Sequence, residues 1–449
     1  MVEKLIEAIR NKKITLALLG SGRVGLSTAA IFAEAGFHVI AVDIKPEIVN
    51  TVNNGISPID EPGLQELISH NVKIGRLKAA LMSDNLFNRM DAIIVSVQTP
   101  ITQDKKPNLS FLINALEDVG KILKKEILVT ISSTLAPRTM LEKIRPKLES
   151  LSGLKSDIDF YLAYVPERIA PGNAVKEFIN SPRLVGGVGP KSTKVAAELF
   201  RTVCKTVIET DATTAEIAKL AENTFRDVNI AFANELALIC EQCSVDVMEV
   251  IKLANTHPRV NIHMPGPGVG GPCLPKDPYL LLNQSKLVEY DVIKSARVVN
   301  DYMPKHIVRL VLRALKEAEK GAGSSRIAVL GTAYKADVDD SRLSPSEPVI
   351  HYLLELGANI IVYDPYCREG FGAEIADSLH EAVKDADCLV IMTDHKEFRN
   401  LCLKKVRMLM KDKSAIVDAK RIVNPLKAEK LGFLYYGVGF VKRGYKDIY

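Results

Sequence analysis

Short apolar runs alternate with segments of helical character along the first third of the chain. The runs at 14–19, 38–43, 91–100 and 126–134 contain few charged residues, and a further run begins near Phe160. A strand in a parallel sheet is covered on both faces, so it reads as a continuous apolar run. Strands that alternate with helices predict βαβ units and a parallel α/β sheet.

The middle of the chain is predicted to contain one long helix. Residues 211–243 include neither Gly nor Pro, and Thr213 followed by Glu216 fits a capping box. Apolar residues run nearly all round this segment, which is typical of a helix buried between domains.

Three polar residues share one face of that helix. Lys219, Asn223 and Arg226 follow each other at i, i+4 and i+7. Ordinary helices direct such residues to water, although the neighbouring Ala and Leu residues leave little polar surface here. The spacing alone is compatible with two alternatives: a functional site built by these three side chains, or a helix face exposed to water.

The last third repeats the alternation of strands and helices after a linker at 321–325. The expected fold is therefore α/β, with two Rossmann-type parallel-sheet domains joined by a central helical region with one long helix. We expect these three domains at 1–208, 209–320 and 321–449.

A glycine-rich turn follows the first predicted strand. Gly20, Gly22 and Gly25 form G-x-G-x-x-G between a strand and a helix, and the next strand ends in Asp43. The glycines allow a tight turn, the approach of a pyrophosphate and helix packing, while the carboxylate accepts hydrogen bonds from ribose hydroxyls. This combination predicts NAD rather than NADP; the alternative is a Rossmann-type sheet that binds nothing.

Polar residues also end later strands of the first third. Thr99 and Thr134 are placed to line the cofactor crevice, because ligands of parallel sheets lie beyond the carboxyl ends of the strands. Each threonine could instead cap a helix. Glu167 and Arg168 follow another strand and are expected to belong to the site.

The loop 265–278, PGPGVGGPCLPKDP, contains too many backbone breakers for a helix or strand. Gly270 and Gly271 allow another chain or a ligand to approach the backbone. A thiolate at Cys273 would be a nucleophile, and the charge of Lys276 would favour it. The alternative is a buried, inert cysteine in a rigid turn.

A metal site is not expected. Cys240 and Cys243 make one C-x-x-C inside a helical pattern, with no second pair, and His257 and His263 lack a partner at helical spacing. In the last third, by contrast, Lys335 and Arg342 follow a strand where they could hold a phosphate compound.

Composition narrows the class of protein. The chain has 449 residues, 47% hydrophobic and 25% charged, with a net charge of +5. Its lysines are spread out, so nucleic acid is not the expected partner. No apolar run approaches the roughly 20 residues of a membrane helix, and the start lacks a signal-peptide core. Seven scattered cysteines favour a reducing, cytoplasmic location.

Together these segments resemble the UDP-glucose/GDP-mannose dehydrogenase family over nearly the whole chain. The resemblance is carried by GSGRVG, Asp43, PERIAPG, KLAENTFRDVNIAFANE, GPGVGGPCLPKDP and GTAYKADVDDSRLSP. It implies that the three domains bind NAD, form the dimer core with the catalytic loop, and bind a UDP-sugar. It further implies a four-electron oxidation of a sugar C6 alcohol to a carboxylate, through a cysteine thioester that water hydrolyses.

The resemblance assigns roles by position. It implies catalytic roles for Cys273, Lys219, Asn223, Asp277 and Glu167. Cofactor contacts are implied for Gly20, Gly22, Val24, Gly25, Asp43, Thr99, Thr134, Lys276 and Arg342. Substrate contacts are implied for Arg168, Ile169, Arg226, His257, Arg259, Gly270, Tyr334, Lys335 and Lys420. Arg23 replaces the aromatic residue usual in the glycine turn and could alter how the pyrophosphate is held.

Within the family, PERIAPG and ENTFRDVNIAFANE favour UDP-N-acetyl-D-mannosamine as substrate. The resemblance also implies a homodimer or higher homo-oligomer as the assembly. UDP-N-acetylglucosamine and UDP-glucose are alternatives that differ too little to separate by inspection. A non-catalytic nucleotide-sugar-binding protein is a third alternative, which would not need Cys273, Lys219, Asn223 and Asp277.

Overall fold

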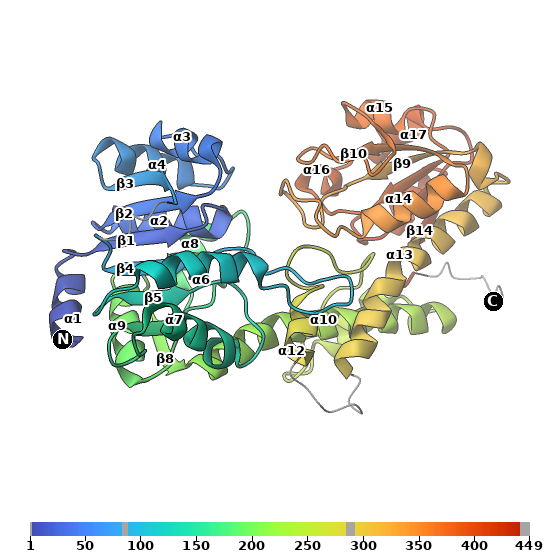
Figure 1. Ribbon diagram of the computed structural model, residues 1–449. Helices are drawn as coiled ribbons and strands as arrows, with labels where there is room; N and C mark the ends of the chain where they lie inside the picture. Colours follow the sequence, from blue (N-terminus) through green and yellow to red (C-terminus); the bar gives the residue numbers. More distant parts are fainter. Residues whose placement is uncertain (1, 83–88, 284–291, 441–449) are drawn as a thin grey trace. The chain divides into compact units, whose positions relative to one another are not determined.

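The computed structural model describes residues 2–82, 89–283 and 292–440 (Figure 1). Contacts divide the chain into two compact units. Unit 1 comprises Met1–Glu222 and Tyr279–Lys286, and unit 2 comprises Asn223–Pro278 and Leu287–Tyr449. The three domains expected from the sequence are not tested by this division and stay a prediction.

Unit 1 is built on an eight-stranded sheet in the order β3-β2-β1-β4-β5-β6-β7-β8. Neighbouring strands are parallel except for the antiparallel pair β6 and β7. The first six strands have the doubly wound order of dinucleotide-binding folds, whose switch point lies between β1 and β4. The strands are β1 (Thr15–Leu19), β2 (His38–Asp43), β3 (Leu77–Leu81), β4 (Ala92–Val95), β5 (Leu128–Ile131), β6 (Tyr161–Tyr164), β7 (Arg183–Gly187) and β8 (Val207–Asp211).

Helices cover both faces of this sheet. Successive side chains of β1 point to opposite faces and therefore belong to two different hydrophobic clusters. Leu16 and Leu18 belong to one buried cluster, while Ala17 and Leu19 belong to the other. The helices of unit 1 are α1 (Val2–Arg10), α2 (Arg23–Glu34), α3 (Pro46–Asn53), α4 (Leu64–Lys73), α6 (Ser110–Ile122), η1 (Met140–Ile144), α7 (Arg145–Ser152), α8 (Ala174–Asn180) and α9 (Pro190–Arg201).

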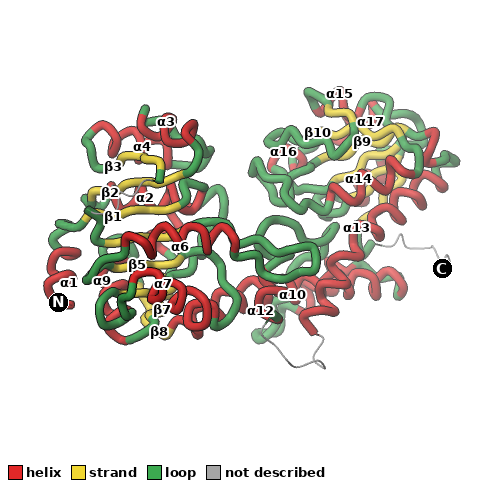
Figure 2. Tube along the Cα trace, in the orientation of Figure 1, coloured by secondary structure: helices red, strands yellow, loops and turns green. Residues whose placement is uncertain are grey.

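Unit 2 contains a second parallel sheet in the order β11-β10-β9-β12-β13-β14, which repeats the order of the first six strands of unit 1 (Figure 2). Its strands are β9 (Arg326–Leu330), β10 (Asn359–Tyr363), β11 (Glu374–Ile375), β12 (Cys388–Ile391), β13 (Ala415–Asp418) and β14 (Leu434–Gly437). Around it lie α13 (Val292–Glu317), η2 (Ala322–Ser324), α14 (Ser346–Glu355), α15 (Leu379–Val383), α16 (Lys396–Arg399), α17 (Leu403–Leu409) and α18 (Pro425–Lys430). The predicted α/β fold with two parallel sheets and a helical region is confirmed.

The long helix predicted for the middle of the chain is α10 (Ala212–Gln242), and the shorter α11 (Val247–Ala254) and α12 (Asp277–Leu282) follow. The capping box predicted for its start is wrong. The helix begins one residue before Thr213, and Asp211 accepts the Thr214 N–H instead, over 2.9 Å. No helix in the described part of the chain is long and apolar enough to cross a membrane.

Candidate active site

The glycine turn after β1 has the geometry of a dinucleotide loop. Gly20 has φ +96°, and a Cβ there would lie 2.5 Å from the Ser96 carbonyl oxygen. At Gly25 a Cβ would lie 1.8 Å from the Gly20 carbonyl oxygen, so α2 can pack on the turn only through glycine. At Gly22 no atom lies within 4 Å of the Cβ position. That open approach, at the start of α2 and beside Val24, fits a pyrophosphate.

Asp43 ends β2 beside this turn. One carboxylate oxygen accepts the Ser21 N–H over 2.9 Å, and the other accepts the Lys45 N–H over 3.0 Å. Both bonds orient the carboxylate at the carboxyl end of the sheet, where a ribose would lie. The chemistry of the turn and of this carboxylate therefore fits NAD.

The two threonines predicted for the crevice lie side by side. The Thr99 hydroxyl, beyond β4, donates to the Thr134 carbonyl beyond β5 over 2.7 Å. Thr99 is buried and Thr134 is half-buried. Neither β4 nor β5 is followed directly by a helix at these residues, so a capping role for the two hydroxyls is not seen.

The side chain of Arg23 is held by protein groups. Its guanidinium donates to Glu61 over 2.8 Å and to the Asp60 carbonyl over 2.9 Å. The Glu61 side chain is fully buried and also accepts the N–H groups of Gly172, over 3.0 Å, and of Ala174, over 2.7 Å. Glu61 thus joins the glycine turn to the end of PERIAPG, a role that sequence inspection missed because the residues are far apart in the chain.

Glu167 and Arg168 are both engaged inside unit 1. One Glu167 oxygen accepts the N–H groups of Arg168 and Ile169, and the other pairs with the buried Arg183 over 2.9 Å. Arg168 pairs with Glu222 of α10 over 2.6 Å. These bonds hold the segment after β6 in one conformation. The role of Glu167 as a base stays a prediction.

The face of α10 that the spacing predicted is partly buried. Lys219, in unit 1, is 7% exposed, and Asn223, the first residue of unit 2, is 8% exposed. Arg226 is exposed. The buried lysine and asparagine do not belong to a solvated helix face, whereas Arg226 does reach solvent.

Asn223 meets the loop that carries the cysteine. Its side-chain amide donates to Asp277 Oδ2 over 2.6 Å, and Asp277 is fully buried. Among the described residues no group hydrogen-bonds the other oxygen, Oδ1, and Lys276 Nζ is 3.9 Å from it. A buried carboxylate oxygen with unused capacity is suited to orienting water or a substrate group.

Cys273 lies one turn before that carboxylate. Its carbonyl accepts the N–H groups of Lys276 over 3.0 Å and of Asp277 over 2.9 Å. The cysteine is exposed. The alternative of a buried thiol in this turn is therefore wrong, because the residue is accessible to solvent.

The glycines of this loop contact the loop after β9 within unit 2. The Gly271 N–H donates to the Arg342 carbonyl over 3.0 Å, and a Cβ at Gly271 would lie 2.6 Å from the Tyr334 ring. A Cβ at Gly270 would lie 2.6 Å from the Leu343 carbonyl oxygen. At these glycines the close approach is made by another segment of the same chain, whereas the sequence predicted another chain or a ligand.

Three of the cationic residues predicted for ligand binding belong to this part of unit 2. Arg342 forms a two-pronged pair with Asp340, over 2.8 and 2.6 Å, which raises the pKa of its guanidinium. Lys420 Nζ lies 3.4 Å from Asp394. Lys335 is exposed. Their contacts to a ligand stay predictions.

The segment before the cysteine loop is held by asparagines of α10. Asn229 accepts the His263 N–H over 2.8 Å, and Asn234 accepts the Gly266 N–H over 2.8 Å. His257 and Arg259 are exposed. Burial and the nearby charge of Arg226 lower the pKa of His263.

The described residues contain no cluster of His, Cys, Asp and Glu suited to a metal ion. All seven cysteines lie in the described part of the chain, and none forms a disulfide. Cys240 is buried in the core of unit 2, and Cys243 is exposed.

Comparison with known proteins identifies the family to which this protein belongs. Residues 13–204 match the NAD binding domain of the UDP-glucose/GDP-mannose dehydrogenase family, residues 213–302 its central domain and residues 328–425 its UDP binding domain. The chain belongs to this family. It is an NAD-dependent UDP-sugar dehydrogenase, an oxidoreductase.

Individual relatives are similar over nearly their whole length. A UDP-N-acetyl-D-mannosamine dehydrogenase of Pyrococcus horikoshii is 42% identical over 425 residues, covering 94% of this chain and 99% of the relative. A solved structure of UDP-D-ManNAc dehydrogenase from Pyrococcus horikoshii superimposes with a TM-score of 0.89 at 40% identity, covering 95% of this chain and 99% of that one. An NDP-N-acetyl-D-galactosaminuronic acid dehydrogenase from Methanosarcina mazei superimposes with a TM-score of 0.85 at 35% identity, covering 98% of each chain.

Proposed function

We propose that this protein oxidises the C6 hydroxyl of UDP-N-acetyl-D-mannosamine to a carboxylate, with NAD as oxidant and a thioester on Cys273 as intermediate. The observation that carries the mechanism is an exposed cysteine one turn before a buried carboxylate that Asn223 orients. The substrate is supported by the name of the Pyrococcus horikoshii relative, which is 42% identical.

The side chains of this protein would divide the chemistry as follows. NAD, when bound, accepts a hydride in each of the two oxidations. The Cys273 thiolate adds to the C6 aldehyde, which keeps the reactive product of the first oxidation on the enzyme. Lys219 is the group that holds or moves the proton of the reacting oxygen, with Asn223 beside it in sequence. Asp277 orients the water that hydrolyses the thioester, and Glu167 is the second candidate base.

Ligand contacts are proposed for the remaining predicted residues. The cofactor set is Gly20, Gly22, Val24, Gly25, Asp43, Thr99, Thr134, Lys276 and Arg342. The UDP-sugar set is Arg168, Ile169, Arg226, His257, Arg259, Gly270, Tyr334, Lys335 and Lys420. Both sets are supported by their positions in the matched NAD binding, central and UDP binding domains.

A homodimer is proposed as the working assembly. Phe225, Phe232 and Ile239 recur every seven residues on α10 and are 63%, 54% and 50% exposed. Large apolar residues in a row on one helix face favour a second copy as the covering partner. A cytoplasmic location is proposed on the seven cysteines, none of which forms a disulfide.

A substrate panel tests the proposed reaction. NADH formation is followed by absorbance with UDP-N-acetyl-D-mannosamine, UDP-N-acetylglucosamine, UDP-glucose and UDP-N-acetylgalactosamine, the last because of the Methanosarcina mazei neighbour at 35% identity. We expect two NADH per sugar from UDP-N-acetyl-D-mannosamine and a kcat/KM about tenfold or more above the others. A higher kcat/KM for another sugar would replace the proposed substrate, and no NADH from any would contradict the proposal.

The thioester is tested by Cys273→Ser. Serine is a weaker nucleophile and leaving group, so we expect the steady release of two NADH per sugar to stop and an aldehyde-level or ester-like adduct to accumulate. Cys402→Ser, at another exposed cysteine of unit 2, is the matched control. Unchanged stoichiometry and rate in Cys273→Ser would show that the covalent mechanism is wrong.

A further inference from the structure

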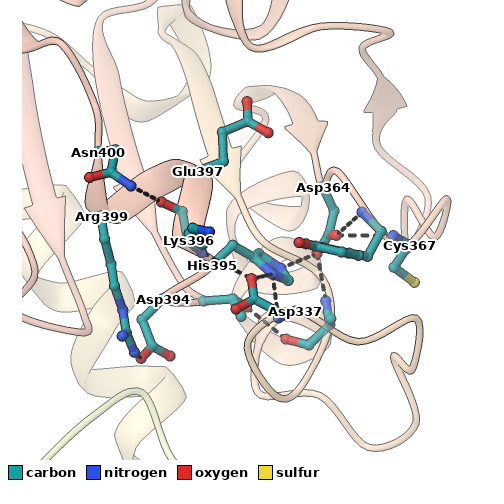
Figure 3. A network of polar contacts seen from close by, with 12 residues as sticks. Asp337, Asp364, Cys367, Asp394, His395, Lys396, Glu397, Arg399 and Asn400 are labelled. Atoms are coloured by element: carbon teal, nitrogen blue, oxygen red, sulfur yellow. Dashed lines mark hydrogen bonds and ion pairs between the residues drawn. The ribbon is translucent and has the colours of Figure 1, made fainter. Parts of the chain in front are cut away.

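A buried carboxylate–histidine pair lies at the carboxyl end of the second sheet (Figure 3). Asp364 follows β10, at the position equivalent to Asp43, which is the last residue of β2. His395 follows β12, and its Nε2 lies 3.0 Å from Asp364 Oδ2. Both side chains are at most 1% exposed. No role was predicted for either residue from the sequence.

The turns beside the two carboxylates are alike in backbone. The Gly20 N–H donates to the Val42 carbonyl, the Gly331 N–H donates to the Tyr363 carbonyl, and both glycines have φ +96°. The repeat of the strand order therefore extends to the conformation of the first turn.

The carboxylates differ in what they bind. Asp364 Oδ2 accepts the N–H groups of Thr332 over 2.8 Å and of Ala333 over 2.9 Å, besides the bond from His395. Its Oδ1 accepts the N–H groups of Tyr366 over 2.9 Å and of Cys367 over 3.0 Å. Five donors occupy this carboxylate, so it is not available to ribose hydroxyls, and two N–H groups of the turn point at it rather than at a pyrophosphate.

His395 closes the segment that follows the turn. The Asp337 N–H donates to His395 Nδ1 over 2.8 Å, so the ring proton is on Nε2 and faces Asp364. The imidazole stacks on Tyr366 with centroids 5.0 Å apart and meets the edge of Phe398 at 5.3 Å. The His395 ring therefore links the backbone at Asp337 to Asp364, which in turn binds the backbone at Ala333. Tyr334 and Lys335, both predicted to bind substrate, lie between these two anchors.

The hydroxyl of Thr393 holds the same segment after β9. Thr393 donates to the Ala333 carbonyl over 2.6 Å and is 2% exposed. The Tyr334 ring also packs closely against Gly271, because a Cβ there would lie 2.6 Å from the ring. Gly271 lies two residues before Cys273. The chain of contacts from His395 thus reaches the loop of the proposed nucleophile without leaving unit 2.

We propose that His395 and Asp364 are positioning residues that hold Tyr334 and Lys335 in place for the uridine diphosphate end of the substrate. Through Tyr334 packed on Gly271, the pair also sets the position of the cysteine loop. The proposal rests on the proposed function for its ligand but not for the identity of the sugar.

The test uses the full-length protein and UDP itself as the probe. Binding of UDP and of NAD is measured separately by calorimetry for His395→Phe, which keeps an aromatic ring but loses both polar bonds, and for His395→Gln, which keeps a donor. We expect His395→Phe to raise the Kd of UDP about tenfold and to leave the Kd of NAD within about twofold, with partial recovery in His395→Gln. The alkylation rate of Cys273 by iodoacetamide, measured by peptide mass spectrometry, is expected to change with His395→Phe.

A milder variant guards against failure to fold. Thr393→Val removes only the bond to the Ala333 carbonyl and is expected to weaken UDP binding about twofold to fivefold. Lys413→Ala, at an exposed ion pair with Glu319, is the control and should bind UDP as the unaltered protein does. Unchanged UDP binding in both His395→Phe and Thr393→Val, or equal losses for UDP and NAD, would overturn the proposal. Since no sugar is used, a wrong choice of sugar substrate would not affect this result.

Discussion

The side-chain amide of Asn223 donates to the carboxylate of Asp277 over 2.6 Å, and 54 residues separate the two in the chain. The bond orients a fully buried carboxylate so that one oxygen is held by the amide. Among described residues the other oxygen accepts no hydrogen bond. A carboxylate held in this way can orient water for a hydrolytic step.

Asp277→Asn is therefore expected to slow hydrolysis of the proposed thioester. The amide cannot accept a proton from water, so kcat should fall by about 10²-fold or more while the KM for the UDP-sugar changes little. Rapid quenching and mass spectrometry should detect the accumulated acyl-enzyme. Glu235→Gln, at an exposed position of α10, is the control. A variant with full kcat and no acyl-enzyme would remove Asp277 from the hydrolytic step.

Asp43 is expected to set the preference for NAD over NADP. Asp43→Asn keeps an acceptor for the Ser21 N–H but removes the charge that repels a 2′-phosphate. We expect the ratio of kcat/KM values for NAD and NADP to fall by about tenfold. Glu47→Gln, four residues further on and exposed, tests whether any loss of negative charge has this effect. An unchanged ratio in Asp43→Asn would count against the assignment.

Glu61 is expected to stabilise unit 1. Replacing it with Ala leaves the N–H groups of Gly172 and Ala174 and the Arg23 guanidinium without their buried acceptor. We expect the free energy of unfolding in urea to fall by about 2–4 kcal/mol and the KM for NAD to rise. Arg23→Ala removes the partly exposed guanidinium with its bonds to Glu61 and to the Asp60 carbonyl, but it keeps both backbone donors to Glu61. Its loss should therefore be smaller, about 1–2 kcal/mol. Equal losses in the two variants would mean that the backbone bonds of Glu61 contribute nothing.

Stability is expected to fall as the pH rises through the neutral range because of Glu216. Burial raises the pKa of this carboxyl from 4.5 to about 7, against the opposing N–H groups of Met140 and Arg138. Between these two values the folded protein binds more protons than the unfolded chain. The stability that protonated Glu216 provides is therefore complete below about pH 4.5 and is lost as the pH passes about 7, a change of about 3 kcal/mol.

The measurement is the free energy of unfolding in urea at several pH values between about 5 and 8. Glu216→Gln cannot titrate and is expected to flatten this slope relative to the unaltered protein. Glu142→Gln, at the exposed neighbour whose charge also raises the pKa of Glu216, should reduce the slope only slightly. Parallel slopes for Glu216→Gln and the unaltered protein would contradict the prediction.

Local signals predicted much of the fold. The apolar run at 14–19 became β1, and the segment 211–243 became α10. The glycines at 20, 22 and 25 shape the turn between β1 and α2. These features depend on residues next to each other in the chain, through strand and helix periodicity or through a glycine conformation that other residues rarely adopt. The irregular loop of glycines and prolines around Cys273 is likewise a local feature, and the cysteine in it is exposed.

Partners distant in sequence could not be predicted in this way. Glu216 matched a capping box by spacing, yet its carboxylate binds the N–H groups of Arg138 and Met140. Arg23, beside the pyrophosphate turn by sequence, is held by Glu61, and His395 closes the loop after β9 through Asp364.

The amino-acid sequence by itself determined the strands, the long helix, the cofactor turn and the family, because each is encoded in a local pattern. Only the tertiary structure decided which buried carboxylate each amide, guanidinium or imidazole meets. A buried polar group must find a partner, and the one it finds depends on how distant segments pack rather than on its own neighbours in the chain.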